Sequence, residues 1–387
     1  MSLSLLRLIT MDRKYFIFLL TSIVFTITSS LFFYKKMFAT EKKISTIMGD
    51  FHVREKIIID AIANKSLERM KLVDQGGPCV YFGLAPSFPR YDHCLGVWAL
   101  LRRFNASINE QLVGLWHDIS HTAFSHVAEV VFNHKDENHS YQDKIHLWYL
   151  DNSSAHDLIE DYQLNLNDLD PDCGLYQMLE QPLPDMCADR IEYNLHTAFV
   201  YAIFTKEEID SILNHLHYGP VKYQKNNEII EENKWYFDEI CSAKKFALLP
   251  LYFMQTIWAT PDNVVFYKLF SQILKYAFEK KYITKSLFHF GTDQEILTIL
   301  NQQKDTTLEE MLKNLHTAKR NFKVVNQNSD DYDEEIYAKF RGIDPLILQS
   351  GDQEAKRLTI LDQNFCYAYL RMKEKTAKPA KIKYIKK

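Results

Sequence analysis

Apolar residues recur at helical spacing along most of the chain, which predicts a largely helical protein. The helices that this spacing predicts cover Ile44 to Val73, about His93 to Phe104, Ile108 to about Phe132, and several later segments. The pattern changes between Gly219 and Trp235, where alternating residues on either side of Asn226-Asn227 predict a β-hairpin. We therefore expect an all-α fold: a helical bundle followed by a mostly helical C-terminal region that carries one small hairpin.

Residues 15–34 form an uncharged run that is long enough to span a bilayer, although its serines and threonines make it only moderately apolar. Three interpretations remain open: a membrane anchor, a signal peptide, or an upstream extension with Met37 or Met48 as the true start. We favour the anchor, and hence a membrane-associated protein. This interpretation predicts three parts: an N-terminal segment (1–44) with a transmembrane helix (15–34), a main domain (45–215), and a C-terminal region (216–387).

Composition excludes some classes of protein. With 47% hydrophobic and 25% charged residues, the chain is typical of a folded globular protein and not of a disordered one. Its net charge of −4 predicts no specific nucleic-acid binding. The C-terminal tail is locally basic, and we interpret it as a solvated end. The 6 cysteines contain no C-x-x-C pair, which favours free thiols over a disulfide framework.

The densest chemistry lies between Leu115 and His126. Three histidines, His117, His121 and His126, occur there together with Asp118, inside a segment predicted to be a buried helix. On a helix His117 and His121 would share one face, because they are separated by four positions. Imidazole and carboxylate groups are common metal ligands, and histidine is also the usual proton carrier near neutral pH. This density favours a catalytic or metal site over isolated core histidines.

Two further stretches complete a recognisable set. One runs from Arg90 to Val97 and reads R-Y-D-H-C-L-G-V, and the other runs from Asp185 to Tyr193 and ends D-R-I-E-Y. Together with H-D-I-S-H-T-A-F-S-H they resemble the motifs of the HD phosphohydrolase superfamily, in the branch of dGTP triphosphohydrolases and the SAM-and-HD-domain dNTPase. The resemblance covers about residues 50–196. It implies an HD-domain helical bundle around a metal centre.

The resemblance also implies residue roles. The metal ligands would be His93, His117, Asp118 and Asp189, and they would hold a divalent ion such as Mn²⁺, Fe²⁺ or Mg²⁺. The catalytic histidines would be His121, His126 and His146, and the substrate-binding residues Arg90, Arg190 and Tyr193. Glu129 is an alternative structural partner for one of these histidines. Arg341-Gly342-Ile343-Asp344-Pro345 resembles a recurrent C-terminal segment of such proteins, to which the sequence assigns no chemical role.

Two departures leave the substrate open. No glutamate follows His146, and Thr197 stands where the branch carries an aspartate. The leading hypothesis is a nucleotide phosphohydrolase that cleaves a dNTP to nucleoside and triphosphate. The alternatives are a phosphohydrolase for nucleoside monophosphates, cyclic nucleotides or another phosphoester, and a membrane-tethered nucleotide sensor without turnover. The resemblance further implies a homo-oligomer and a catalytic domain that faces the cytoplasm, with a cytoplasmic or exported protein as the alternatives.

Overall fold

The computed structural model describes residues 38–132, 140–316 and 322–385. The elements of the N-terminal half are β1 (Phe38–Thr46), β2 (Gly49–Glu55), α3 (Lys56–Ile62), α4 (Lys65–Arg69), η1 (Met70–Leu72), α5 (Pro78–Tyr81), α6 (Arg90–Arg103), α7 (Ile108–Trp116), α8 (Val127–Val131), α9 (Tyr141–Asp151), α10 (Ala155–Tyr162), η2 (Leu166–Leu169) and α11 (Ala188–Val200). Those that follow are α12 (Lys206–Asn214), β3 (Leu216–Lys225), β4 (Glu228–Phe237), α13 (Ile240–Phe253), η3 (Met254–Trp258), α14 (Pro261–Glu279), α15 (Lys285–Phe290), α16 (Asp293–Gln302), α17 (Thr306–His316), β5 (Phe322–Val324), β6 (Glu334–Ile336), β7 (Leu346–Ile347), β8 (Lys356–Arg357), α18 (Leu358–Leu361), α19 (Gln363–Thr376) and β9 (Ala380–Tyr384).

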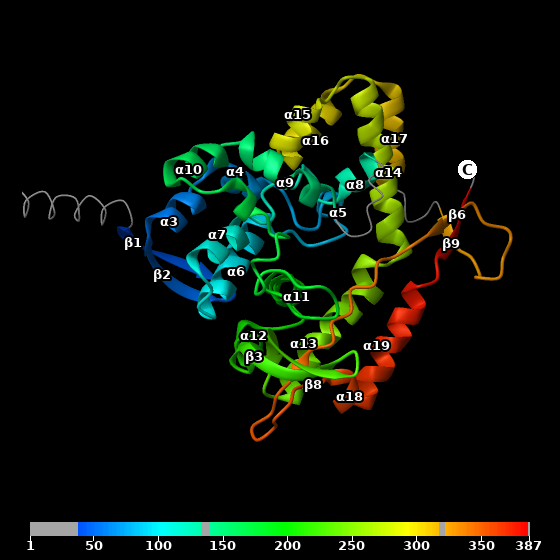
Figure 1. The fold of residues 1–387 in the computed structure, drawn as a ribbon. Helices are drawn as coiled ribbons and strands as arrows, with labels where there is room; N and C mark the ends of the chain where they lie inside the picture. The colour runs from blue at the N-terminus through cyan, green and yellow to red at the C-terminus, as the bar shows by residue number, and fades with distance from the viewer. Residues whose placement is uncertain (1–37, 133–139, 317–321, 386–387) are drawn as a thin grey trace, which may run out of the picture.

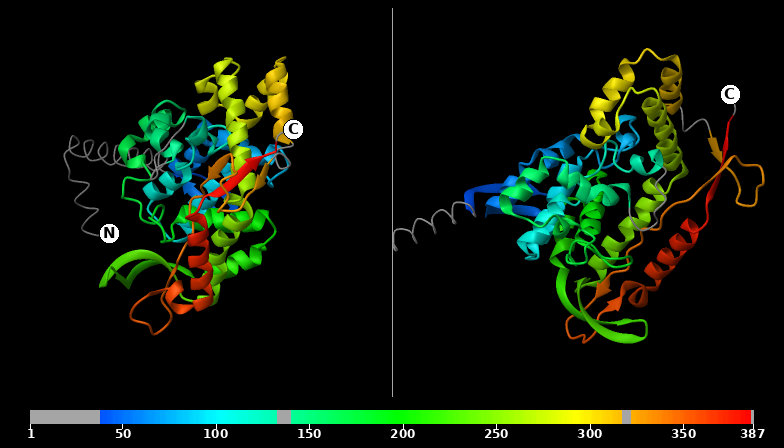
Figure 2. Two further views of the ribbon diagram at one scale, coloured as in Figure 1. Left: turned by 90° about the vertical axis from the view of Figure 1, so that its right-hand side faces the viewer. Right: turned by 45° about the horizontal axis from the view of Figure 1, so that its top comes forward.

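Helix α11 lies at the centre of the molecule, with α6 and α7 beside it (Figure 1). Helix α6 is buried on nearly every face, from Cys94 to Leu101, because α7 and α11 both pack against it. The helices α14 to α17 rise above this centre, and the β3–β4 hairpin, α18 and α19 lie below it (Figures 1 and 2). The core around α6, α7 and α11 continues to α13 and α19, and a second cluster joins α8 to α14 and α16.

The expected all-α fold is wrong: the described residues contain three β-sheets and form a mixed α/β structure. The sheets have the strand orders β1-β2, β3-β4-β7-β8 and β5-β9-β6. Part of the predicted helix from Ile44 to Val73 is the β1–β2 hairpin, which turns at Gly49 with a φ of 136°. The basic tail contributes strand β9, which pairs with β5 and β6 instead of ending free in solvent. Strands β5 to β8 span only two or three residues each, which is too few for an alternating pattern to be recognised.

The hairpin predicted between Gly219 and Trp235 is present as β3 and β4, which pair from Leu216 with Phe237 to Lys225 with Glu228. Its two turn residues, Asn226 and Asn227, have φ values of 52° and 67°. Positive φ at both positions is what a tight hairpin requires, and asparagine tolerates it better than most residues. The turn chemistry therefore made this prediction possible. The boundary between a main domain (45–215) and a C-terminal region (216–387) stays a prediction.

The predicted helix from Ile108 to Phe132 is interrupted. Helix α7 ends at Trp116, and α8 begins only at Val127. Between them the chain forms consecutive turns, in which Phe124 and Ser125 have φ values of 61° and 57°, outside the helical region. His117 and His121 consequently do not share a helix face, and a turn presents them instead.

The predicted membrane association is contradicted for the described chain, in which no helix is both long and apolar enough to cross a bilayer. The run that suggested it, residues 15–34, lies outside the described residues.

Candidate metal centre

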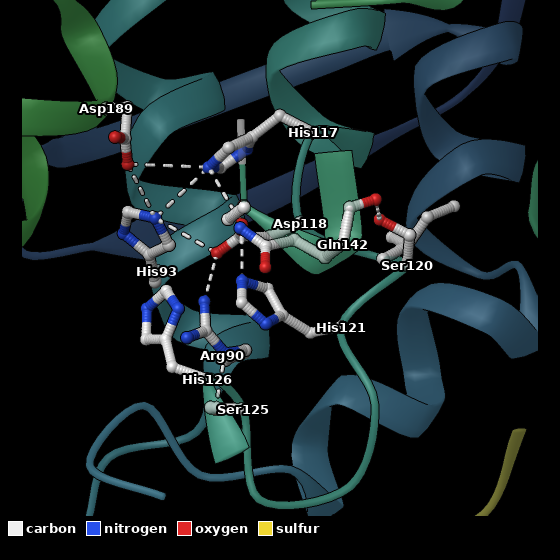
Figure 3. A network of polar contacts seen from close by, with 12 residues as sticks. Arg90, His93, His117, Asp118, Ser120, His121, Ser125, His126, Gln142 and Asp189 are labelled. Atoms are coloured by element: carbon white, nitrogen blue, oxygen red, sulfur yellow. Dashed lines mark hydrogen bonds and ion pairs between the residues drawn. The ribbon is translucent and has the colours of Figure 1, made fainter. Parts of the chain in front are cut away.

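Four side chains of the HD motifs converge at the junction of α6, α7 and α11 (Figure 3). The Nε2 atom of His93 lies 3.2 Å from Nε2 of His117, 3.1 Å from Asp189 Oδ1 and 3.5 Å from Asp118 Oδ2. Nε2 of His117 lies 3.5 Å from Asp189 Oδ1 and 3.7 Å from Asp118 Oδ1. His93, His117 and Asp118 are buried, and Asp189 is partly exposed to the adjoining cavity. Two nitrogens and two carboxylates thus surround one point.

Each imidazole is held through its second nitrogen. His117 Nδ1–H donates to the backbone carbonyl of Gly114 at 2.8 Å. His93 Nδ1 makes a short hydrogen bond with Glu192, a carboxylate that is fully buried on α11. A carbonyl oxygen only accepts, so the proton of neutral His117 lies on Nδ1 and its Nε2 presents a lone pair. Partners of this kind orient metal-bound histidines and set their tautomer.

This geometry fits a divalent cation. The lone pair of His117 Nε2 points at His93 Nε2 and at two carboxylates, so a positive charge is needed at the point they share. Burial would lower the pKa of His93, but the carboxylates of Glu192, Asp189 and Asp118 raise it to about 10. The cluster therefore attracts a cation strongly, and two imidazoles with two carboxylates suit a first-row ion better than a thiolate-type structural site.

Arg90 contacts the centre directly. Its Nη1–H donates to Asp118 Oδ2 at 2.5 Å and its Nε–H to Ser125 Oγ at 2.7 Å, while its buried Nη2 has no partner among the described residues. Burial favours the neutral acid at Asp118, yet Arg90 and His117 hold the pKa of that carboxyl well below its usual value. Arg90 thus fixes a candidate ligand and still has a donor available at the cavity wall.

His121 and His126 lie on the other side of Asp118, with their rings 5.0 Å apart (Figure 3). His121 Nε2–H donates to Asp118 Oδ1 at 3.1 Å, and its buried Nδ1 has no partner among the described residues. Burial, together with Arg90, lowers the pKa of His121 to about 3, which keeps it neutral. His126 Nδ1 bonds Glu129 Oε1 at 3.0 Å. Burial would raise the pKa of Glu129, but its bond with His126 lowers it to about 2.

The remaining predicted residues are placed differently. His146 is buried and bonds Ser120 Oγ at 3.1 Å, in the turn between Asp118 and His121. The Nη1–H groups of Arg190 donate to backbone carbonyls of Gln181 and Asp185, so this arginine braces the loop before Asp189. Tyr193 packs edge-on against the ring of Trp258 at 5.7 Å. All three residues line the same cavity, and their catalytic or substrate-binding roles stay predictions.

The sequence did not reveal two features of the site: the supporting role of Glu192, and the need for a glycine at position 96. Glu192 joins His93 to His196, whose Nδ1 lies 2.7 Å from Glu192 Oε1. A Cβ atom at Gly96 would lie 2.0 Å from that same oxygen, so only glycine leaves room for the carboxylate. The available signal was positional: Gly96 and Glu192 each follow a candidate ligand, His93 and Asp189, by three positions, one helical turn.

The buried His146 predicts a pH dependence of stability. Burial lowers its pKa to about 4, whereas the unfolded chain titrates near 6.5. Between these values the unfolded state binds the proton and the folded state does not, so the free energy of unfolding falls as the pH falls through this window. We expect His146→Gln to remove up to about 3 kcal/mol of that loss. Urea unfolding of the wild type and the variant from pH 4 to 7 measures this difference. If the free energy of unfolding changed equally with pH in both proteins, the lowered pKa of His146 would be contradicted.

Comparison with known proteins agrees with this picture. No protein-family model matches the chain. A metal-dependent phosphohydrolase, cns2 of Cordyceps militaris, is 22% identical over 315 residues, which cover 81% of this chain and 87% of that protein. Together with the HD motif residues, this relative supports a place in the HD-type phosphohydrolase superfamily. The uncharacterised protein YdhJ of Bacillus subtilis is 30% identical over 303 residues, or 78% of this chain and 86% of YdhJ. The chain therefore belongs to the same family as YdhJ.

Two solved structures share the fold. A phosphohydrolase from Bacteroides thetaiotaomicron superposes with a TM-score of 0.65 at 16% identity, covering 89% of this chain and all of that one (100%). A hypothetical protein from Aquifex aeolicus gives a TM-score of 0.60 at 15% identity, covering 89% of this chain and 96% of that one. At these identities the likeness concerns the fold alone.

Proposed function

We propose that this protein is a metal-dependent phosphohydrolase whose substrate is a nucleotide. The observation that carries the proposal is the convergence of His93, His117, Asp118 and Asp189. All of these except the fully buried His93 line one large cavity. The name of the Cordyceps relative supports both the metal dependence and the reaction class. A cavity of about 2060 Å³ is larger than an orthophosphate needs and leaves space for a base and a sugar.

The metal would be held by His93, His117, Asp118 and Asp189, and Mn²⁺, Fe²⁺ and Mg²⁺ are the candidates. When bound, such an ion supplies Lewis-acid polarisation of a phosphate oxygen and lowers the pKa of a bound water. Arg90 would bind a phosphate oxygen through its unpartnered Nη2–H, in a site where charge-assisted bonds are strong. Glu192 and the Gly114 carbonyl would keep the two imidazoles in the orientation that binding requires.

His126 is the candidate general acid for the departing nucleoside oxygen. It is partly exposed at the cavity, and Glu129 accepts from its Nδ1–H. In the imidazolium form its Nε2–H is then free to give a proton to the leaving oxygen. His121 is neutral and donates to Asp118, so its free Nδ1 can only accept a hydrogen bond, for example from a water or a substrate hydroxyl. The two histidines would thus have different tasks although their rings touch.

A second candidate is a phosphohydrolase for monophosphates or cyclic nucleotides. It is favoured by Thr197, which lines the cavity where the dNTPase branch carries an aspartate. A product assay separates the two functions. The Mn²⁺-loaded protein is incubated with dNTPs, NTPs, monophosphates and cyclic nucleotides, and the products are resolved by ion-exchange chromatography. Nucleoside plus intact triphosphate supports the first function, and products from the other substrates alone support the second. Bound metal without any turnover would refute both and favour a sensor.

A further inference from the structure

The segment from Tyr337 to Pro345 brings a cation to the wall of the cavity. It runs without helix or strand between β6 and β7, and passes beside α13 and α14 as the orange stretch in Figures 1 and 2. Arg341 is half-buried in this segment and lines the same cavity as His126, Glu129 and Tyr193. Burial raises the pKa of Tyr193, and the charge of Arg341 opposes that shift. The same charge adds to the bond with His126 in lowering the pKa of Glu129. Arg341 therefore lines the same cavity as the candidate catalytic His126 and the candidate substrate-binding Tyr193.

The backbone on either side of Arg341 is fixed. The Arg341 N–H donates to Met254 Sδ at 3.1 Å, and Ile343 is fully buried. The Asp344 N–H donates to Pro184 O at 3.0 Å, while the Asp344 carboxylate accepts the backbone N–H and the hydroxyl of Thr359 at 3.0 and 2.6 Å. The segment is thereby docked on the loop that precedes Asp189. This packing explains the Ile343-Asp344-Pro345 motif structurally and leaves the side chain of Arg341 unexplained.

The guanidinium of Arg341 makes no hydrogen bond or ion pair within the ranges that the structure describes. Other cations of the cavity wall are engaged: Lys225 with Glu232, Lys234 with Asp185, Lys268 with Glu334, and Arg190 with backbone carbonyls, while Lys275 and Lys339 also have partners. Arg90 is committed to Asp118 and Ser125 by two of its three nitrogens. Arg341 thus offers the cavity a complete, uncommitted guanidinium.

We propose that Arg341 binds a second phosphate of the substrate, beyond the phosphate that lies at the candidate metal centre. This inference rests on the proposed function and narrows its substrate class to nucleoside di- or triphosphates. The guanidinium fork matches phosphate oxygens bidentately, and because the backbone of the segment is already docked, binding does not have to order it. Arg90 and Arg341 then share the charge of a polyphosphate: Arg90 is buried beside the candidate metal centre, and Arg341 is half-buried elsewhere in the cavity wall.

Binding of inorganic triphosphate and of orthophosphate to the Mg²⁺-loaded full chain, measured by calorimetry, tests the proposal. Arg341→Gln is expected to weaken triphosphate binding about ten-fold or more and to change orthophosphate binding less than about two-fold. Arg341→Lys should recover part of the loss, because it keeps the charge but not the fork. Arg371→Gln is the matched control: this arginine is exposed on α19 and does not line the cavity.

Unchanged triphosphate binding in Arg341→Gln would overturn the proposal. An equal loss for both anions would overturn it too, because the residue would then act at the metal centre or on the fold. Thermal unfolding of each variant identifies a folding defect. If Arg341→Gln is destabilised, the triphosphate binding of Arg341→Lys is used instead, and binding weaker than that of the wild type but with orthophosphate binding unchanged would support the proposal. The binding assay needs no turnover, so an inactive wild-type protein would refute the proposed function without deciding the role of Arg341. Normal turnover by the wild-type protein, with triphosphate binding unaltered in Arg341→Gln, would support the proposed function and overturn the role of Arg341.

Discussion

Asp118→Asn is expected to lower turnover at least about a thousand-fold and to remove most of the bound metal, because metal assistance supplies several kcal/mol of catalysis. Asp118 is the residue on which the candidate site depends most. Its Oδ2 accepts from Arg90 and its Oδ1 from His121, and both oxygens face the candidate ligand imidazoles. Asparagine keeps the size and one acceptor oxygen of the aspartate but removes its charge. A loss of metal in this variant therefore reports the lost charge and not a packing defect, which an alanine substitution would not distinguish.

Metal content per chain and turnover of a phosphoester substrate are measured on the same preparation of Asp118→Asn. Asp92→Asn is the matched control, since Asp92 is an exposed carboxylate on α6 next to His93 and is not one of the converging groups. The control should retain both metal and activity. Full activity in Asp118→Asn would show that the site has been assigned wrongly.

Gly96→Ala is expected to destabilise the protein by about 2–4 kcal/mol, through overpacking and a broken charge-assisted hydrogen bond. The new Cβ would lie 2.0 Å from Glu192 Oε1 and 2.6 Å from its Cδ. Glu192 cannot yield easily, because it is fully buried and bonded to both His93 and His196. Displacing it should also weaken metal binding about 10-fold or more, because His93 loses the partner that orients it.

Denaturant unfolding and metal titration measure these two effects. Gly219→Ala serves as the control, because a Cβ there meets nothing within 4 Å. The double variant Gly96→Ala/Glu192→Ala should be no less stable than Glu192→Ala alone, because the clash requires the carboxylate. If Gly96→Ala behaved like Gly219→Ala, the close approach of Glu192 to α6 would be wrong.

The convergence of the HD motif residues could be foreseen from the sequence, whereas their backbone setting could not. Motif order predicted that His93, His117, Asp118 and Asp189 would meet, and the structure brings them together. Apolar periodicity also extended the helix through Asp118 to Phe132, because it cannot register the left-handed backbone at Phe124 and Ser125. That turn separates the tasks of His117 and His121, which a continuous helix would have placed on one face.

Long-range partners account for most of what the sequence did not show. Glu192 bonds His93 on another helix, and Ser120 bonds His146 on α9, and the apolar pattern along the chain does not identify such contacts. The same holds for the fold class. Strand β9 pairs with β5 and β6, and β7 pairs with β4 from far along the chain, so these strands depend on tertiary contacts and not on local periodicity. The β3–β4 hairpin was predictable because its turn residues lie next to each other.

The most direct test of the central claim, that hydrolysis depends on one divalent ion held by His93, His117, Asp118 and Asp189, is a metal titration followed by turnover. The purified full chain is stripped with a chelator, titrated with Mn²⁺, and assayed for phosphate-containing products after each addition. We expect no turnover in the stripped protein and activity that rises with Mn²⁺ until about one ion is bound per chain. Full turnover in the metal-free protein would contradict the account.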